Sequence, residues 1–222
     1  MSDLVTLDEI RAAKERLAGV AVRSALYRIE RARLKQAVAA EPEFDIYIKA
    51  ESEQPIGSFK LRGAYNMVAQ LPPEKLGRGV ITCSSGNHAQ GVAYAARALG
   101  AKAVIVMPDN APEMKKAATK ALGAEIVMVG PASSERQAKA EELAAQFGYT
   151  IIPPYGHRAI IAGQATCGLE ILEQLPNVDL IVAPVSGGGL LSGTATAVKL
   201  SAPDVQVWGA EPELAADAKE SF

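Results

Sequence analysis

The chain has 222 residues, of which 49% are hydrophobic and 22% charged, and its formal net charge is −2. This composition is typical of a globular protein long enough to bury a sizeable core. An aromatic content of 5% without a basic stripe argues against nucleic-acid binding, and no apolar run reaches membrane-spanning length.

A capping box at Thr6-Leu7-Asp8-Glu9 predicts a first helix that ends near Gly19. Apolar β-type runs and helical periodicity then alternate along the chain, which predicts parallel sheets in an α/β protein. We expect strands at 46–48, 80–83, 103–107, 126–129, 151–152, 180–185 and 205–208, and helices at 59–70, 87–99, 112–122, 134–147, 160–175 and 190–200.

Lys60 follows the extended segment Gly57-Ser58-Phe59 at the expected start of a helix. This position would fix the amine. Burial, or a nearby cation such as Arg62, would lower its pKa so that it acts as a nucleophile or base near neutral pH. The alternative is a surface lysine whose aliphatic stem covers the helix start.

The segment from Ser84 to Gly91 reads Ser-Ser-Gly-Asn-His-Ala-Gln-Gly and follows the apolar run from Val80 to Cys83. A strand that ends in hydroxyl residues and glycine, and then opens a helix, presents backbone N–H groups and side-chain donors to an anion. We predict that this segment binds a carboxylate.

Three consecutive glycines, 187–189, follow the strand expected at 180–185. Glycine has no Cβ, so the main chain of such a turn can wrap a phosphate with its own N–H groups. We predict a phosphate-binding loop, with a simple tight turn as the alternative. Nucleotide binding is a poor match, because Thr194-Ala195 stand where Lys-Ser/Thr would be needed and Ser192 takes the place of the last dinucleotide glycine.

Together these segments resemble the fold-type II pyridoxal-phosphate enzymes, and within them the serine/threonine dehydratase and serine racemase family. The likeness covers nearly the whole chain and keeps the order of the motifs. It also includes Met107-Pro108, Ala111-Pro112, Lys115, Gly123-Ala124, the run from Ile161 to Thr166 with Glu170, and Ala210-Glu211-Pro212.

The resemblance implies an α/β fold with two lobes, each an open parallel sheet with helices on both faces, as in the tryptophan synthase β subunit. Pyridoxal 5′-phosphate would bind in the cleft between the lobes. We expect residues 1–80 and 152–222 to form the larger lobe and residues 81–151 the smaller. Family members continue for about a hundred residues, so we expect a longer polypeptide in which a later Ser, Thr or Cys faces the pyridine nitrogen.

The resemblance assigns the cofactor contacts. Lys60 would hold the cofactor as a Schiff base and, once displaced by substrate, remove the Cα proton. Phe59 would pack against the cofactor, and Asn87 would donate to its phenolic oxygen, with a plain helix N-cap as the alternative for Asn87. The phosphate would accept N–H groups from Gly187, Gly188, Gly189 and Leu190.

The resemblance also assigns the substrate contacts. Ser85 matches the serine that serves as acid/base on the face opposite the lysine in the racemases. The substrate carboxylate would be held by Ser84, Ser85, Asn87 and His88.

A divalent-cation site is a further expectation from the resemblance. Glu211, the Ala215 carbonyl and Asp217 have the spacing of such a site in some dehydratases and racemases, and oxygen ligands suit Mg²⁺ or Ca²⁺. The alternative is an exposed acidic turn.

The run Pro153-Pro154-Tyr155-Gly156-His157 departs from the aromatic-then-acidic pattern of many threonine dehydratases. Tyr155 and His157 would either reshape the substrate side of the cleft or form a surface loop. Arg136 lies where some relatives contact a second carboxylate, which leaves hydroxyaspartate open as a substrate.

The expected function is a dehydratase that converts a small β-hydroxy amino acid, namely L-threonine, L-serine or 3-hydroxyaspartate, to a 2-oxo acid and ammonia. The alternatives are amino acid racemisation, β-replacement and a non-catalytic fragment. We further expect a cytoplasmic homodimer. Cys83 and Cys167 are predicted to be buried thiols, and a catalytic role for Cys83 is the weaker reading because no third group orients His88.

Overall fold

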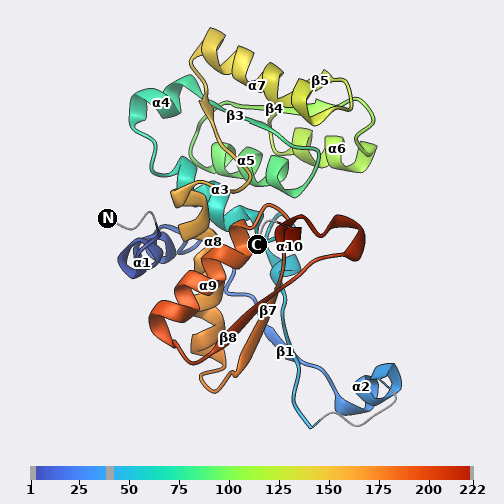
Figure 1. The fold of residues 1–222 in the computed structure, drawn as a ribbon. Helices are drawn as coiled ribbons and strands as arrows, with labels where there is room; N and C mark the ends of the chain where they lie inside the picture. Colours follow the sequence, from blue (N-terminus) through green and yellow to red (C-terminus); the bar gives the residue numbers. More distant parts are fainter. Residues whose placement is uncertain (1–3, 39–42, 221–222) are drawn as a thin grey trace.

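The computed structural model describes residues 4–38 and 43–220 of an α/β protein (Figure 1). The strands are β1 (Leu26–Arg28), β2 (Tyr47–Lys49), β3 (Val80–Cys83), β4 (Ala103–Pro108), β5 (Glu125–Val129), β6 (Thr150–Ile151), β7 (Leu180–Pro184) and β8 (Gln206–Ala210). The helices are α1 (Leu7–Arg16), α2 (Arg31–Val38), α3 (Lys60–Val68), α4 (Pro73–Arg78), α5 (Asn87–Ala98), α6 (Glu113–Ala121), α7 (Ser133–Phe147), α8 (Arg158–Gln174), α9 (Gly189–Ser201) and α10 (Asp217–Glu220), with 3-10 turns η1 (Glu51–Glu53) and η2 (Glu213–Ala215).

A four-stranded parallel sheet in the order β5-β4-β3-β6 forms one side of the molecule. Helix α7 covers one face of this sheet, and α5 and α6 cover the other (Figure 1). Alternate residues of β4 serve the two layers, since Ile105 and Met107 join the core cluster of α5 whereas Val104 and Val106 join Ala140 of α7. Burial on both faces explains why β4 is apolar throughout.

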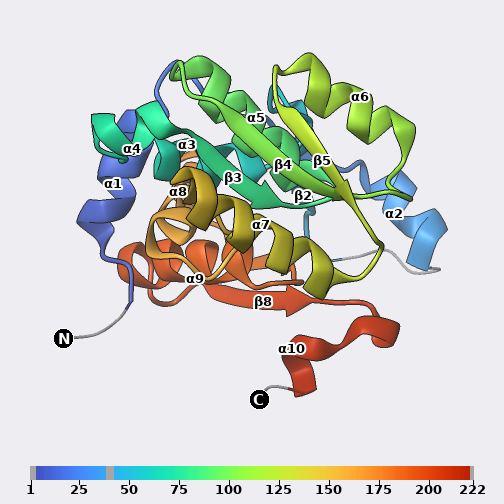
Figure 2. The same ribbon diagram turned by 90° about the horizontal axis from the view of Figure 1, so that it is seen from above.

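The parallel pair β7-β8 forms a second sheet, packed on α8 and α9. In Figure 2, β3, β4 and β5 lie side by side, and β8 lies beyond α8 and α9 on the opposite side of the molecule. Among the described residues, one face of this second sheet is packed, because Ile181 and Ala183 are buried, whereas Val182 and Trp208 are 56% and 57% exposed.

The capping box predicted for the first helix is confirmed. The Glu9 N–H donates to Thr6 Oγ1 at 3.3 Å, and the Thr6 N–H donates to Glu9 Oε2 at 2.8 Å. The helix ends at Arg16, three residues before the expected glycine. These reciprocal hydrogen bonds satisfy two N–H groups that the helix start leaves without intrahelical partners.

The predicted α/β class is confirmed, with helices on both faces of the four-stranded sheet, and the prediction of parallel strands holds with one local exception. β2 was expected in a parallel sheet, but it pairs with β1 in antiparallel orientation, with Tyr27 opposite Ile48. β1 escaped prediction because its Leu-Tyr-Arg sequence forms no apolar run and its side chains are largely exposed.

The four-stranded sheet runs from Val80 to Ile151, close to the predicted smaller lobe of residues 81–151. The division of the chain into two lobes stays a prediction. Within residues 4–38 and 43–220, no helix is long and apolar enough to cross a membrane.

Candidate active site

Lys60 is the first residue of α3, and its ammonium is held at a defined point. Its Nζ donates a hydrogen bond to the carbonyl of Pro154 at 2.7 Å and lies 5.3 Å from the centroid of the Phe59 ring. Burial lowers the pKa of the Lys60 amine, because desolvation disfavours the charged form. The side chain therefore has a fixed position, and its pKa is shifted in the direction that favours a nucleophilic amine.

Arg62 lies two residues further along α3, but its charge does not act on Lys60 as the sequence suggested. The guanidinium is 1% exposed and is paired with the carboxylates of Glu51 and Glu170. Burial alone would lower the pKa of Arg62, but the hydrogen bonds that it donates to these two carboxylates raise it. Of the two causes that the sequence offered for a lowered Lys60 pKa, burial is the one found, and the charge of Arg62 is paired with two carboxylates.

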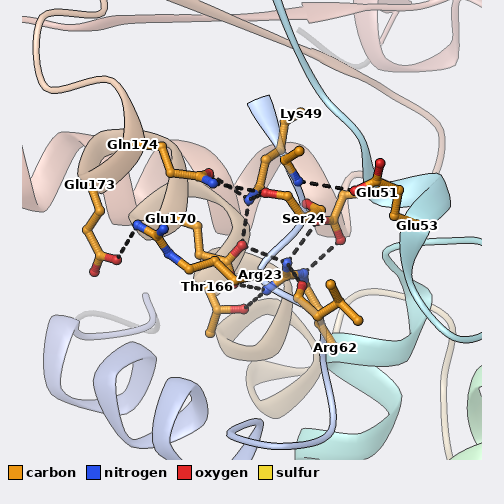
Figure 3. Close-up of polar contacts among 12 residues, drawn as sticks. Arg23, Ser24, Lys49, Glu51, Glu53, Arg62, Thr166, Glu170, Glu173 and Gln174 are labelled. Atoms are coloured by element: carbon orange, nitrogen blue, oxygen red, sulfur yellow. Dashed lines mark hydrogen bonds and ion pairs between the residues drawn. The ribbon is translucent and has the colours of Figure 1, made fainter. Parts of the chain in front are cut away.

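A buried ionic network anchors the start of α3 to α8 and η1 (Figure 3). Arg62 donates to both oxygens of Glu51 at 2.7 and 2.8 Å and to both oxygens of Glu170 at 2.7 and 2.9 Å. Lys49 Nζ donates to Glu170 at 2.6 Å and to Gln174 at 2.9 Å. Bidentate pairs of this kind fix orientation as well as distance, so the network sets the direction in which α3 presents Lys60.

The turn between β3 and α5 contains the predicted carboxylate-binding segment. Gly86, and not Asn87, is the N-cap of α5, and no side chain in the described parts of the chain caps this end. Asn87 is the first helical residue and is exposed, so the N-cap alternative for Asn87 is wrong. Ser84 and Ser85 are half-buried. A helix start without side-chain caps is suited to an anion.

His88 is 3% exposed, and its Nε2 donates to the carbonyl of Ile152 at 2.9 Å. Burial lowers the pKa of His88 to about 4, against a weaker opposing effect of that hydrogen bond. The ring is therefore a neutral, structural group at pH 7. Substrate binding by His88 stays a prediction. Because the ring already donates to a backbone carbonyl, the group of His88 that would bind the carboxylate is its backbone N–H.

The glycine loop joins β7 to α9. Gly188 is the N-cap of α9 with a φ of 78°, a left-handed conformation that favours glycine. A Cβ on Gly187 would lie 2.0 Å from Cδ1 of Tyr155, so this glycine permits a close contact with an aromatic ring. Leu190 is half-buried in the first turn of the helix. Phosphate binding by this loop stays a prediction.

One short segment contacts all three motifs. The Ile152 carbonyl accepts from His88, the Pro154 carbonyl accepts from Lys60, and the Tyr155 ring lies against Gly187. Residues that are far apart in sequence thus meet along four consecutive residues after β6. We call residues 152–155 the bridging segment. Sequence reasoning missed its role because two of its three contacts use backbone carbonyls, which every residue has.

Residues 27–222 match the family model described as pyridoxal-phosphate dependent enzyme. The chain belongs to this family. Among its relatives, L-threo-3-hydroxyaspartate ammonia-lyase of Saccharomyces cerevisiae is 45% identical over 177 residues, which cover 80% of this chain and 54% of that protein. Serine racemase of Schizosaccharomyces pombe is 40% identical over 225 residues, which cover 100% of this chain and 68% of that protein.

The solved structure of maize serine racemase resembles the chain with a TM-score of 0.91 at 36% identity, covering 98% of this chain and 64% of that one. The resemblance to the fold-type II enzymes of the dehydratase and racemase family is therefore confirmed. The chain spans 54% of the ammonia-lyase and 64% of the maize racemase chain.

The residues present fit the family's cofactor. Lys60 supplies an amine of lowered pKa, and the starts of α5 and α9 carry no side-chain caps within the described residues. In those same residues, Ser58 Oγ is the one buried side-chain polar atom without a hydrogen-bond partner. An unsatisfied buried hydroxyl is costly and is commonly explained by a function or an absent ligand.

The predicted cation site has less support. Glu211 accepts the backbone N–H groups of Lys219 at 2.8 Å and Ala218 at 3.1 Å, so it caps α10. Ala215 lies in the 3-10 turn before this helix, and the Asp217 side chain lies outside the described residues. No cluster of three or more His, Cys, Asp or Glu suited to a metal occurs in the described part of the chain. Cation binding stays a prediction.

The two cysteines are poor nucleophiles. Cys167 is buried, and burial raises its pKa to about 12. Cys83 is half-buried at the end of β3, and burial raises its pKa as well. Because the thiolate is the reactive form, these surroundings argue against the catalytic-thiol reading of Cys83.

Three further side chains from the predicted motifs and relatives' patterns have defined neighbours in the structure. His157 is the N-cap of α8, and its Nδ1 accepts the Ala159 N–H at 3.1 Å. Arg136 donates to the Ser133 hydroxyl at 2.8 Å. Lys115 Nζ would lie 3.5 Å from a Cβ on Gly86, which places its amine beside the turn predicted to bind a carboxylate. Lys115 matches the family pattern in the sequence, but the sequence did not indicate a role for it.

Proposed function

We propose that this protein is a pyridoxal-phosphate dependent ammonia-lyase that converts a small β-hydroxy amino acid to a 2-oxo acid and ammonia. The observation that carries the proposal is the half-buried Lys60 amine, held 2.7 Å from the Pro154 carbonyl and lowered in pKa by burial, in a chain of a family that includes ammonia-lyases. L-Threonine, L-serine and 3-hydroxyaspartate are the candidate substrates.

Each motif has one task in this proposal. Lys60 removes the Cα proton, the uncapped start of α5 binds the substrate carboxylate, and the loop of residues 187–190 binds the cofactor phosphate. Pyridoxal 5′-phosphate, when bound, supplies the electron sink that makes this proton removable. Phe59 packs beside the Lys60 amine, and Asn87 donates to the cofactor ring. The β-hydroxyl would then leave as water, with the proton that Lys60 has taken from Cα, and water would hydrolyse the resulting enamine to the 2-oxo acid and ammonia.

Amino acid racemisation is the second candidate function, favoured by the 40% identity to serine racemase and by the half-buried position of Ser85. Both reactions begin with the same proton removal by Lys60. Reprotonation from the opposite face requires an acid such as Ser85, whereas elimination does not. The Ser85→Ala variant should therefore keep dehydration in part and lose racemisation.

A substrate panel tests the proposal. The purified protein, loaded with pyridoxal phosphate, is given L-serine, L-threonine and 3-hydroxyaspartate, and ammonia, 2-oxo acid and D-isomer are measured in the same reaction. We expect ammonia and the matching 2-oxo acid. A D-amino acid without ammonia would instead establish the racemase, and neither product from any substrate would contradict both functions and favour the non-catalytic fragment.

The substrate class, the cofactor and the assembly of the whole protein are parts of this proposal, because the chain spans only part of its relatives' length. The predicted homodimer is tested by sedimentation equilibrium of the purified protein. The predicted cytoplasmic location is tested by fractionation of the source cells.

A further inference from the structure

Tyr155 is placed by a contact that hydrophobic burial does not explain. Its side chain is 49% exposed, yet its ring lies so close to Gly187 that a Cβ there would be 2.0 Å from Cδ1 and 2.4 Å from Cγ and Cε1. Burial alone therefore does not account for the position of the ring against Gly187. The contact joins the bridging segment to the glycine loop.

The neighbouring residue carries the contact with Lys60. The carbonyl of Pro154 accepts the Lys60 ammonium at 2.7 Å, and Tyr155 follows directly. Pro153 and Pro154 both have fixed φ angles, so the backbone leading to Tyr155 has little freedom. Gly156 then turns the chain towards α8 with a φ of 71°, which few other residues adopt. The ring and the carbonyl therefore belong to adjacent residues of a conformationally restricted segment.

We propose that Tyr155 is a positioning residue of the cofactor site, whose ring sets the place of the glycine loop relative to the Lys60 amine. The ring touches the loop, the carbonyl of the preceding residue holds the amine, and the two prolines and Gly156 restrict the backbone on either side of Tyr155. The cofactor part of this inference rests on the proposed function. The contact between Tyr155 and Gly187 does not.

The contact is made by ring carbons, so the conservative variant should behave like the wild type. Tyr155→Phe should leave the melting temperature and the pyridoxal phosphate dissociation constant unchanged. Tyr155→Ala should weaken cofactor binding and should speed the reaction of Lys60 with an amine-specific reagent at fixed pH. We expect a change of about tenfold in each, within the range that loss of one packed side chain commonly costs.

A double-variant cycle tests the contact itself. Gly187→Ala should lower the melting temperature of the unliganded protein, because its methyl group collides with the Tyr155 ring. Tyr155→Ala should relieve this collision, so the double variant should be more stable than Gly187→Ala alone. This non-additivity is the expected sign of two side chains in contact.

Gly189→Ala is the matched control. A Cβ at this position would meet the Cβ of Tyr155 at 3.3 Å, and alanine at 155 keeps that atom. Tyr155→Ala should therefore not rescue Gly189→Ala, which separates relief of the ring contact from a general loosening of the loop.

The outcomes separate the inference from the function. No rescue of Gly187→Ala would overturn the contact, and Lys60 labelling in Tyr155→Ala equal to wild type would overturn the positioning role. Peptide mapping of the labelled lysine gives this second readout without any cofactor. A wild-type protein that binds no pyridoxal phosphate would contradict the proposed function, while the rescue and the labelling would still decide the role of Tyr155.

Discussion

Lys60 and Arg62 lie two residues apart at the start of α3 and have opposite surroundings. Arg62 is enclosed and paired with two carboxylates, whereas Lys60 is half-buried and holds a single backbone carbonyl. Breaking the Arg62 ion pairs would leave a charge unpaired in the interior, which is costly. Lys60 would lose only one hydrogen bond to a backbone carbonyl. One residue fixes the helix, so the other is free to react.

The largest effect is expected when Lys60, the reactive residue of the two, is replaced. Lys60→Ala should abolish turnover and leave the melting temperature close to that of wild type, since the change removes a nucleophile at the site. With pyridoxal phosphate bound, the wild type should show a violet absorption band that borohydride reduction removes, leaving the label on Lys60.

Lys102→Ala is the control for that prediction, because Lys102 pairs with Glu125 at the surface. It should keep full turnover. A reduced and digested wild-type protein that carries the label on a peptide without Lys60 would contradict the assignment.

The ion-pair network around Arg62 predicts a loss of stability when one of its carboxylates is removed. Glu170→Ala should destabilise the fold by about 3–5 kcal/mol, because it leaves the charges of Arg62 and Lys49 partly unpaired in the interior. Urea unfolding measures this. Glu173→Ala, in the same helix, removes exposed pairs with Lys14 and Arg23 and should cost about 0–1 kcal/mol. Equal costs for the two variants would refute an anchoring role.

The free energy of unfolding should depend on pH because His88 is buried. Its pKa is about 4 in the folded protein and about 6.5 in an unfolded chain, so the unfolded state takes up a proton first as the pH falls. Stability should be complete above pH 6.5 and decline as the pH falls towards 4, by up to about 3 kcal/mol.

Urea unfolding at several pH values measures this dependence. His88→Gln should flatten the curve between pH 6.5 and 4, whereas replacement of the exposed His157 by glutamine should not. A wild-type curve that is flat in this window would show that the imidazole titrates normally.

The smallest effect concerns the far end of the chain. If Glu211 and Asp217 bind Mg²⁺ or Ca²⁺, a chelator should lower the melting temperature and added cation should restore it, because a ligand stabilises the state that binds it. Asp217→Ala should remove that response. We expect a small shift, since backbone N–H groups already satisfy Glu211. No response in the wild type would leave Glu211 with only its capping role.

The sequence by itself determined the elements whose signals are local. The Thr6–Glu9 capping box and the apolar strand β4 were predictable, as was the helix that begins at Lys60, because hydrogen bonding near a helix end and burial on two faces constrain the residues themselves. The three motifs also identified the family before any geometry was known.

Tertiary structure decided how those motifs meet. The Pro154 carbonyl beside Lys60 and the Ile152 carbonyl beside His88 leave no mark in the sequence, because any residue offers a backbone acceptor. The partners of Arg62 come from positions 51 and 170, and only the packing of α3 on α8 shows that they neutralise it. Sequence records which groups are present, whereas their charge, burial and pKa depend on neighbours that the fold brings together.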